Sequence, residues 1–427
     1  MGTCDVLIVG SGIIGLTSAY HIKRLNPDLD ILVIDQFSMA GQGDTAKSAG
    51  AFRAFFSSRT NFLLANTSID FYRHVQEELK FDLGMRFNGY LFLLAKGKYV
   101  ELKGLIDEVG KKGVPYSFVD TNELKEYGVN TEVSHDEEAA LMGLEDVYVG
   151  LLIKKAGILK PERLVEFYEG ECKRLGVRFL FNTKVKALLR EPLKPLGIPG
   201  EPFPWQDSEI TGVITQDGKM IKARKKVILA TGSWTPQLLE PLGLPSVIRS
   251  KKRQIFVIKA ETPELRRLLF YKGFSNEGFA PFTILPKHMF FRPSPEEESF
   301  WIGYADPYTG FKFEENPLPE ERFYIEGIYP VLVKYFPQFT DMRPSTSWAG
   351  LYDVNPVDEG PLVYEVSNVI VAAGTSGSGI MKADAIGRVV AAVLKGKDEA
   401  ELFGSKVIKV KDLSLSDRSF EPERLVL

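Results

Sequence analysis

Three glycines near the start of the chain have the spacing of a phosphate-binding turn. Gly10, Gly12 and Gly15 form GSGIIG, which follows the apolar run DVLIV and precedes a stretch of helical character over residues 13–25. Such a turn lets the backbone approach a pyrophosphate, and the positive end of the following helix stabilises the anion. Asp35 closes the next apolar run, DILVID, where a carboxylate can bond ribose hydroxyls. Together these residues predict a dinucleotide site.

A second glycine-rich turn, GTSGSG, lies at residues 374–379, between the apolar run NVIVAAG and a core helix predicted over residues 380–395. A further apolar run, KKVILATG (225–232), also ends in glycine. A long dinucleotide such as FAD needs several chain segments along it, and these lie far apart in a sequence. A strand followed by Thr-Gly is the element found in flavoproteins with two dinucleotide-binding domains. The pattern therefore favours FAD over NAD.

The elements that must position these turns are of two kinds, which alternate along the chain. The first kind is α/β, with a clear helix over 161–175 and a strand over 177–182. The second includes a strand over 89–96 and, from 246 to about 340, aromatic strands that indicate an antiparallel sheet. Helices are also predicted over 60–80, 98–112 and 121–127, and the five prolines of 191–209 predict a loop insertion.

This alternation predicts a fold of α/β and α+β class. In it, a discontinuous Rossmann-type FAD-binding domain is interleaved with a substrate domain built on a mixed or antiparallel sheet. The predicted boundaries are 1–88, 156–236 and 346–400 for the FAD-binding domain, 89–155 and 237–345 for the substrate domain, and 401–427 for a C-terminal tail.

Composition excludes several classes of function. The net charge of -3 gives no field that favours nucleic acid, and the two cysteines exclude a disulfide framework, an iron–sulfur cluster and a Cys-rich zinc site. The four histidines have no metal-ligand spacing, so no metal is expected. No signal peptide and no apolar stretch of about 18 residues is found, which predicts a cytoplasmic protein without a membrane span.

The motifs, taken in order, resemble the D-amino-acid-oxidase-like (DAO) superfamily of FAD-dependent oxidoreductases, over about residues 1–395. Within it they are similar to the sarcosine oxidase, glycine oxidase and proline dehydrogenase branch, in the style of the archaeal dye-linked L-proline dehydrogenases. The motifs that carry the resemblance are GSGIIG with Asp35, AKSAGAFRAFF (46–56), GILKPERL (157–164), ILATGSW (228–234), SWAGLYDVNPVDEGPLV (347–363) and GTSGSGIMKADAIGRVVA (374–391).

The resemblance implies that residues 44–53 cross the flavin and that the second glycine turn lies near its pyrimidine edge. A helix N-terminus near residue 380 would then stabilise negative charge on the reduced ring. The cofactor-binding residues expected on this basis are Gly10, Gly12, Ile13, Ile14, Gly15, Asp35, Gln36, Lys47, Ser48, Ala49, Gly50, Val185, Ala230, Thr231, Gly232, Trp234, Gly350, Gly374, Ser376, Gly377, Ser378, Gly379, Ile380, Met381 and Lys382.

Two cations fall where sarcosine-oxidase-like members bind the substrate carboxylate. They are Arg53, whose planar fork suits a carboxylate, and Lys382, which would also lie near the flavin. The alternatives are a structural salt bridge for Arg53 and a solvated helix residue for Lys382. Four aromatic side chains are candidates to line a cavity above the ring, with Tyr304 and Tyr352 taken with the cations as catalytic residues: Trp348, Tyr304, Tyr308 and Tyr352.

Three departures from the family pattern bear on chemistry. Oxygen-reactive members carry a lysine two residues before the glycine equivalent to Gly303, where this chain has Trp301. Covalent attachment uses a cysteine near SWAG, and none is present there. Ser378 replaces the histidine common in the second glycine turn. These differences favour non-covalent FAD and a dehydrogenase over an oxidase.

The resulting hypothesis is an FAD-dependent dehydrogenase that oxidises a small amino acid or secondary amine to the imine by hydride transfer to flavin N5. L-Proline is the first choice of substrate, and the electron acceptor, other than NAD, is unknown. The alternatives are an amine, glycine or sarcosine oxidase that uses oxygen, a 2-hydroxy-acid dehydrogenase, and a flavin-bearing electron-relay subunit of a larger complex.

Residues 404–427 extend past the last core helix, and their role has two readings. The segment alternates through Val407, Val410, Leu413 and Leu415 and finishes on Leu425, Val426 and Leu427. One reading is a frayed tail. The other is a tail docked on the same chain, or on a partner in a homodimer, with its apolar end near the mouth of the active site.

Overall fold

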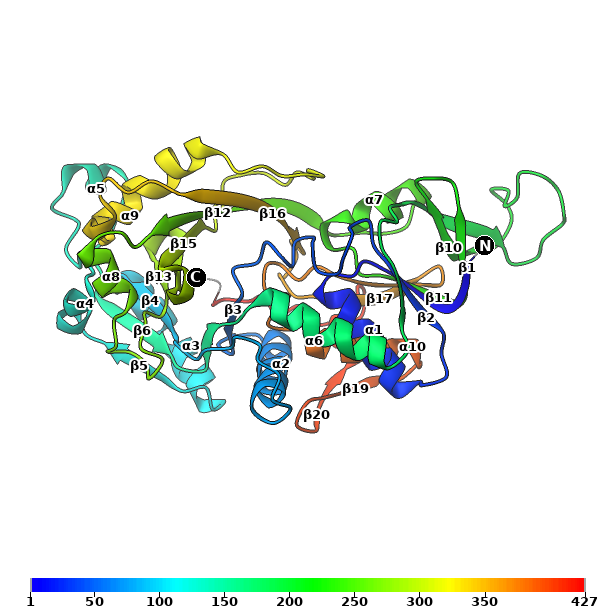
Figure 1. Cartoon of the computed structure of the whole chain (residues 1–427), viewed down its shortest axis with the longest axis horizontal. Helices are drawn as coiled ribbons and strands as arrows, with labels where there is room; N and C mark the ends of the chain where they lie inside the picture. The colour runs from blue at the N-terminus through cyan, green and yellow to red at the C-terminus, as the bar shows by residue number, and fades with distance from the viewer. Residues whose placement is uncertain (1, 426–427) are drawn as a thin grey trace.

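The computed structural model describes residues 2–425 and is elongated, with one β-sheet toward each end (Figure 1). The first sheet has the order β17-β18-β11-β1-β2-β8, and β10 and then β9 extend it from β11. Its strands are β1 (Gly2–Val9), β2 (Ile31–Ile34), β8 (Arg178–Leu180), β9 (Val185–Pro192), β10 (Ser208–Thr215), β11 (Met220–Leu229), β17 (Leu362–Val366) and β18 (Val369–Ala373).

The centre of the first sheet is parallel. β1 pairs with β2 on one side and with β11 on the other, and β11 pairs with β18. All residues of β2 and β18 are buried, because helices or loops cover both faces of a parallel sheet. The carboxyl ends of these strands therefore meet at one edge, where α/β sheets bind ligands.

The second sheet is antiparallel except for the β13–β4 pair, in the order β16-β12-β15-β14-β13-β4-β6-β5. β12 and β16 are long and extend toward the first sheet (Figure 1). The strands are β4 (Tyr90–Leu94), β5 (Tyr116–Val119), β6 (Val149–Ile153), β12 (Arg249–Lys259), β13 (Phe282–Leu285), β14 (Met289–Ser294), β15 (Ser299–Tyr304) and β16 (Thr346–Val354). Two small ribbons complete the strands, β3 (Ala51–Arg53) with β7 (Ala156–Ile158) and β19 (Glu399–Leu402) with β20 (Lys406–Lys409).

Helices α1, α2, α6 and α10 share one hydrophobic core with the first sheet. α1 and α10 cross closely, since a Cβ atom on Gly387 would lie 2.6 Å from the backbone of Thr17. The helices are α1 (Ile13–Leu25), α2 (Arg59–Glu77), α3 (Lys96–Lys111), α4 (Thr121–Tyr127), α5 (Glu137–Leu141), α6 (Pro161–Arg174), α7 (Thr235–Leu239), α8 (Pro263–Leu269), α9 (Tyr329–Tyr335) and α10 (Ala383–Leu394).

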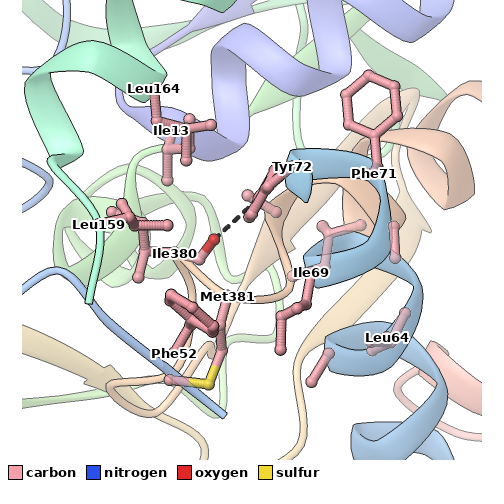
Figure 2. Close-up of a cluster of buried hydrophobic side chains, with 14 of the residues drawn as sticks. Ile13, Phe52, Leu64, Ile69, Phe71, Tyr72, Leu159, Leu164, Ile380 and Met381 are labelled. Atoms are coloured by element: carbon pink, nitrogen blue, oxygen red, sulfur yellow. Dashed lines mark hydrogen bonds between the residues drawn. The ribbon is translucent and has the colours of Figure 1, made fainter. Parts of the chain in front are cut away.

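A cluster of apolar side chains joins the turn before α10 to the neighbouring helices. Figure 2 shows Ile380 and Met381 among side chains from α1, α2, α6 and β3, including Ile13, Phe52 and Leu164. At about 25 cal/mol per Å² of apolar surface, burial of such side chains is the main force holding this turn. The residues after the second glycine turn are therefore fixed by packing from four segments.

The predicted strands and helices are confirmed, with two differences. Strand β9 extends to Pro192 and β10 begins at Ser208, because the two strands pair as a hairpin, so the proline-rich loop is shorter than 191–209. The last core helix begins at Ala383, not at residue 380, because residues 375–382 form the turns that carry the second glycine loop. No helix among residues 2–425 is both long and apolar enough to cross a membrane.

Candidate active site

One cavity of about 570 Å³ lies between the two sheets. The carboxyl ends of β1, β2, β11 and β18 form one side of it, and β4, β12, β13, β14 and β16 form the other. The predicted residues that line it are Gly10, Gly12, Ile13, Ile14, Asp35, Gln36, Lys47, Ser48, Ala49, Arg53, Val185, Ala230, Thr231, Gly232, Trp234, Tyr304, Gly350, Tyr352, Ser376, Gly377, Ser378, Gly379, Ile380, Met381 and Lys382.

The first glycine turn is as tight as its spacing predicts. Gly10 has a φ of +102°, and a Cβ atom there would lie 2.4 Å from the carbonyl oxygen of Ala230. A Cβ on Gly15 would lie 1.9 Å from the carbonyl oxygen of Gly10, so only glycine lets α1 begin this close to β1. Thr45 closes over the turn, since its hydroxyl accepts a hydrogen bond from the Ile13 N–H at 3.1 Å.

Asp35 is held at the end of β2 by the same turn. One carboxylate oxygen accepts hydrogen bonds from the backbone N–H of Ser11 at 2.6 Å and from its hydroxyl at 2.8 Å. The other accepts from the Phe37 N–H at 3.0 Å. The carboxylate is therefore fixed while it lines the cavity.

The segment 44–53 is clamped onto β16. Asp44 accepts a hydrogen bond from the Leu351 N–H at 2.8 Å, and the Trp348 indole donates to the Lys47 carbonyl at 3.0 Å. Beyond it, β3 pairs with β7 and brings Arg53 to the cavity. A stretch with no helix of its own is thus ordered by contacts from both sides.

The second glycine turn is held from β16. Asp353 accepts hydrogen bonds from the Gly374 N–H at 2.8 Å and from the Thr375 hydroxyl at 2.7 Å. Gly377 has a φ of +79°, and a Cβ atom there would lie 2.1 Å from the Tyr352 ring. The turn therefore packs its backbone directly against an aromatic side chain of the cavity wall.

α2 supplies the caps of α10. The Lys382 side chain makes no N-cap hydrogen bond to the helix. Instead, the Tyr72 hydroxyl accepts from the Asp384 N–H at 3.3 Å and the Ser68 hydroxyl accepts from the Ala385 N–H at 3.0 Å. The Tyr72 hydroxyl also donates to the Ile380 carbonyl at 2.8 Å. Two of the helix's free N–H groups are thus satisfied inside the protein.

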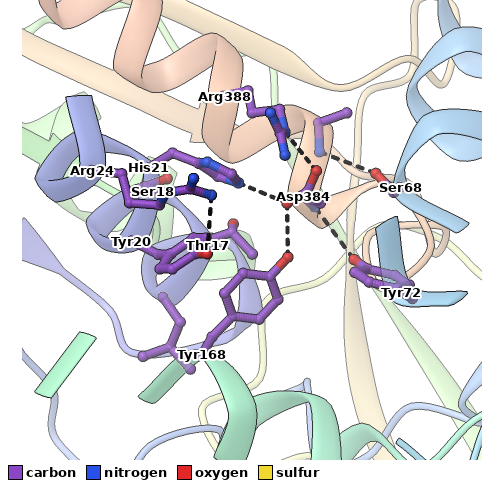
Figure 3. A network of polar contacts seen from close by, with 12 residues as sticks. Thr17, Ser18, Tyr20, His21, Arg24, Ser68, Tyr72, Tyr168, Asp384 and Arg388 are labelled. Atoms are coloured by element: carbon purple, nitrogen blue, oxygen red, sulfur yellow. Dashed lines mark hydrogen bonds and ion pairs between the residues drawn. The ribbon is translucent and has the colours of Figure 1, made fainter. Parts of the chain in front are cut away.

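A buried polar network surrounds the same point (Figure 3). Asp384 is 0% exposed and accepts from His21 at 2.7 Å, Tyr168 at 2.9 Å and Arg388 at 2.7 Å. Burial disfavours its charge, but His21 and Arg388 outweigh burial and hold the pKa of Asp384 below its usual range. The network locks α1, α6 and α10 together immediately behind the second glycine turn.

Arg53 and Lys382 meet at one aromatic ring. The Arg53 guanidinium lies 4.5 Å from the centroid of Phe56, and the Lys382 Nζ lies 4.6 Å from the same centroid. Arg53 Nη1 donates to the carbonyls of Phe55 at 3.0 Å and Leu425 at 2.9 Å. No carboxylate among residues 2–425 forms an ion pair with Arg53, so the salt-bridge alternative is wrong for the described chain.

Lys382 is 1% exposed, so the alternative of a solvated helix residue is wrong. Its Nζ donates to the Asn61 side-chain oxygen at 2.7 Å and to the Ser378 hydroxyl at 2.6 Å. Burial lowers the pKa of Lys382 to about 7, against an opposing effect of the Glu423 charge. A lysine with this pKa, aimed into a cavity, is typical of a functional site.

The family model described as FAD dependent oxidoreductase (DAO) matches residues 5–393. The chain belongs to this family. FAD-dependent oxidoreductase domain-containing protein 1 of Bos taurus is 26% identical over 419 residues, which cover 92% of this chain and 81% of the bovine one. The chain is thus an FAD-dependent oxidoreductase, and its cofactor is FAD.

Solved structures show the same fold. L-proline dehydrogenase from P. horikoshii has a TM-score of 0.70 at 22% identity, covering 93% of this chain and 94% of that one. L-amino acid deaminase from Proteus vulgaris has a TM-score of 0.72 at 17% identity, covering 97% of each chain. The predicted α/β and α+β class, with a Rossmann-type sheet, is confirmed.

The residues of the cavity fit FAD. Its size lies within the 300–1,000 Å³ that is typical of ligand pockets. Gly10 and Gly12 line the cavity with backbone alone, in a turn that is too tight for a side chain at Gly10 or Gly15, and the N-terminus of α1 opens onto the cavity. Asp35, which is fixed by Ser11 and Phe37, would accept hydrogen bonds from ribose hydroxyls. The second glycine turn lines the same cavity, beside Lys382.

Some predicted residues do not line the cavity. Gly15, Gly50 and Gly374 act through the backbone, since Gly50 and Gly374 have positive φ and a Cβ at any of the three would meet neighbouring atoms within 3 Å. Tyr308 is 88% exposed, because it follows β15 in an open loop, and Trp348 packs on Trp301 outside the cavity. These two are therefore wrong as cavity-lining aromatics.

The structure also adds residues to the site that the motifs do not identify. Tyr90 and Phe282 form an aromatic wall, with ring centroids 4.3 Å apart. Asn61 from α2, Arg253 from β12 and Glu423 from the C-terminal tail line the same cavity. None of them stands in a recognisable motif, and only the apolar alternation of the tail gave a signal that it could dock.

Proposed function

We propose that this protein is an FAD-dependent dehydrogenase that oxidises a small amino acid or secondary amine, with L-proline as the first candidate substrate. The observation that carries the proposal is the pair of cations, Arg53 and Lys382, which both lie over the Phe56 ring and line the same cavity. A carboxylate binds an arginine fork and a lysine ammonium through charge-assisted hydrogen bonds.

Arg53 has donor capacity for such a ligand. Its Nη1 is used by two backbone carbonyls, whereas Nε and Nη2 have no hydrogen-bond partner among residues 2–425. These two atoms form the edge of the fork that binds both oxygens of a carboxylate at once. The backbone bonds fix the guanidinium so that this edge is held in place, which lowers the entropy cost of binding.

Position would account for most of the catalysis. When bound, FAD supplies a hydride acceptor at flavin N5. A neutral amine loses hydride from the carbon next to nitrogen, and its nitrogen lone pair forms the new C=N bond, so no general base is required. The aromatic wall of Tyr90, Phe282 and Phe290 limits water beside the reacting carbon, and Tyr352 and Tyr304 complete the walls.

Two features support a dehydrogenase with non-covalent FAD. Trp301 stands two residues before Gly303, stacks on Arg292 at 4.1 Å and does not line the cavity, so no lysine is offered there. Neither cysteine lies at the cavity, since Cys4 is on the first strand and Cys172 is in α6. Among the cavity-lining residues of the described chain there is no histidine, which disfavours a 2-hydroxy-acid dehydrogenase.

The relatives support the substrate class. The proteins named above include an L-proline dehydrogenase and an L-amino acid deaminase, each of the same fold. Both act on a substrate with a carboxylate and an amine, which agrees with the paired cations at the FAD cavity.

We also propose that the chain has the interleaved domain boundaries predicted from the sequence. β16 pairs within the second sheet and lines the cavity that lies between the two sheets.

Anaerobic reduction of the bound flavin tests the proposal. The purified holoenzyme is mixed with L-proline, sarcosine, glycine, D-alanine and 2-hydroxyglutarate, and the loss of flavin absorbance is followed. Bleaching by an amino acid is the expected result, and the reduced flavin should then be reoxidised by an added dye faster than by oxygen when air is admitted. Bleaching only by the hydroxy acid, or by no compound, would refute the proposal, and rapid formation of hydrogen peroxide after the admission of air would indicate an oxidase.

A further inference from the structure

The C-terminal tail is docked on its own chain beside the substrate end of the cavity. Arg418 forms an ion pair with Asp358 at 2.7 Å, and the two side chains are 5% and 7% exposed. Further along, Leu425 is 0% exposed, and its carbonyl accepts from Arg53. Val426 and Leu427 lie outside the described residues. The tail thus has two buried anchors, one on each side of residues 419–424.

Among the tail residues that the structure describes, Glu423 is the one that lines the cavity. One carboxylate oxygen accepts from the Ser57 N–H at 2.8 Å, the Ser57 hydroxyl at 2.7 Å and the Leu425 N–H at 3.0 Å. The other accepts from the Ser58 N–H at 3.2 Å and the Asn61 amide at 3.4 Å. These five donors hold a carboxylate at a defined point of the wall.

Glu423 is coupled to both predicted carboxylate-binding cations. Asn61 links Glu423 to Lys382, since its amide nitrogen donates to Glu423 and its oxygen accepts from Lys382. Glu423 also lines the cavity together with Arg53. Burial opposes the charge of Glu423, but the bonds from Ser57 outweigh burial and keep its pKa below the usual range, so the group is an anion at neutral pH.

A fixed anion beside two cations changes which ligands the site favours. It repels any ligand whose only charge is a carboxylate, since like charges in a partly desolvated cavity oppose binding. A ligand that also carries an amine would offset this repulsion, either through the attraction between an ammonium charge and the Glu423 carboxylate on binding or through an N–H that the neutral, reacting amine donates to that carboxylate. The same anion stabilises the positive charge that develops on nitrogen when hydride leaves.

From this geometry we propose that Glu423 is a specificity-determining residue, which the C-terminal tail supplies to make the site select amino acids over 2-hydroxy acids and simple carboxylates. The inference rests on the proposed function, in which Arg53 and Lys382 bind the substrate carboxylate. A purely structural role for Glu423 predicts a different result, since loosening a structural clamp would weaken the binding of all ligands alike.

The test compares Glu423→Gln with Arg424→Gln in the holoenzyme. Glutamine keeps the shape of the side chain and removes its charge, whereas Arg424 is an exposed neighbour in the same tail whose substitution also changes the charge by one. Acetate binding is followed by the change in flavin absorbance. Flavin reduction is measured with L-proline and with L-lactate, each over a range of concentrations.

We expect Glu423→Gln to bind acetate about tenfold more tightly, since one fixed like charge has been removed from a partly buried site. The same variant should reduce the preference for L-proline over L-lactate by about tenfold or more, with Arg424→Gln unchanged in both measurements. Weaker binding of acetate and L-proline alike would indicate a clamp and overturn the inference, as would equal effects of the two variants.

The design separates this inference from the proposed function. If no amino acid reduces the wild-type flavin, the proposed function fails, and acetate binding still decides whether Glu423 acts on the two cations. If L-proline reduces the wild type and the preference is unaltered in Glu423→Gln, the inference fails and the proposed function stands. Amide hydrogen exchange at Ser57 and Ser58 shows whether the tail stays docked in each variant.

Discussion

Replacing Tyr72 with phenylalanine tests whether α2 holds the second glycine turn in shape. The Tyr72 hydroxyl is buried and joins two backbone groups, the Ile380 carbonyl at 2.8 Å and the Asp384 N–H at 3.3 Å. The change removes one oxygen atom and leaves the ring in place between α2 and α10 (Figures 2 and 3). Both backbone groups lose their partner.

The magnitude follows from these two contacts. A buried hydrogen bond contributes about 1 kcal/mol net, and a buried group left without a partner costs about 1–3 kcal/mol. Loss of an N-terminal helix cap costs about 1 kcal/mol on its own. We therefore expect Tyr72→Phe to lower the free energy of unfolding by about 2 kcal/mol. In this variant FAD must order a loosened turn when it binds, and that cost should weaken FAD binding about tenfold.

FAD binding to the apoprotein is measured by the quenching of flavin fluorescence, with thermal unfolding followed in parallel. Tyr364→Phe is the matched control, since the Tyr364 hydroxyl makes a similar bond of 2.9 Å to the Pro245 carbonyl and neither residue lines the cavity. The control should lose stability and keep its affinity for FAD. If Tyr72→Phe binds FAD as tightly as the wild type, apolar packing of Ile380 and Met381 alone holds the turn, and the reasoning is refuted.

Three further predictions follow from the site. Gly15→Ala should abolish FAD retention, because its Cβ would lie 1.9 Å from a backbone oxygen. Gly170→Ala, which has open space around it, should retain FAD and raise the free energy of unfolding by up to about 1 kcal/mol. Equal FAD content in the two variants would contradict the prediction. Arg53→Lys should raise KM for the amino-acid substrate by about 30-fold or more, with a smaller effect on kcat, because lysine lacks the guanidinium edge that binds both carboxylate oxygens. An unchanged KM would exclude Arg53 as the carboxylate ligand. Because burial lowers the pKa of Lys382 to about 7, its ammonium is present below pH 7 and lost above it. The acetate dissociation constant should therefore rise about tenfold from pH 6 to pH 8. Lys382→Met should show no such rise, and a rise of equal size in that variant would assign the titration to another group.

Local patterns were sufficient for much of the fold. The apolar run that ends in Gly10, the following helix and Asp35 predict a βαβ unit, since strand, turn and helix each depend on residues close in the chain. The structure confirms them as β1, α1 and β2. The start of α10 was misplaced by three residues, because the caps of that helix come from Tyr72 and Ser68 of α2, which no local pattern reveals.

The candidate site was predictable only in part. The motifs place Arg53 and Lys382 in separate segments, and only the resemblance to a family relates those segments to one substrate. The structure places both cations at the Phe56 ring, after β3 has paired with β7 and the turn before α10 has packed on α2. Tyr308 lies in the turn-like stretch ADPYTG after the strand that ends at Tyr304, and it is exposed.

The sequence by itself determined the glycine turns, the carboxylate of Asp35 and the strands that end at them, because these depend on backbone conformation and on the alternation of apolar residues over a few positions. The tertiary structure alone decided which side chains meet around Lys382 in the cavity. Glu423, Asn61 and Lys382 come from the tail, α2 and the edge of α10, and their contact depends on the packing of all three. Burial then lowers the pKa of Lys382. A lysine that local sequence alone would place on the surface thus lines the cavity.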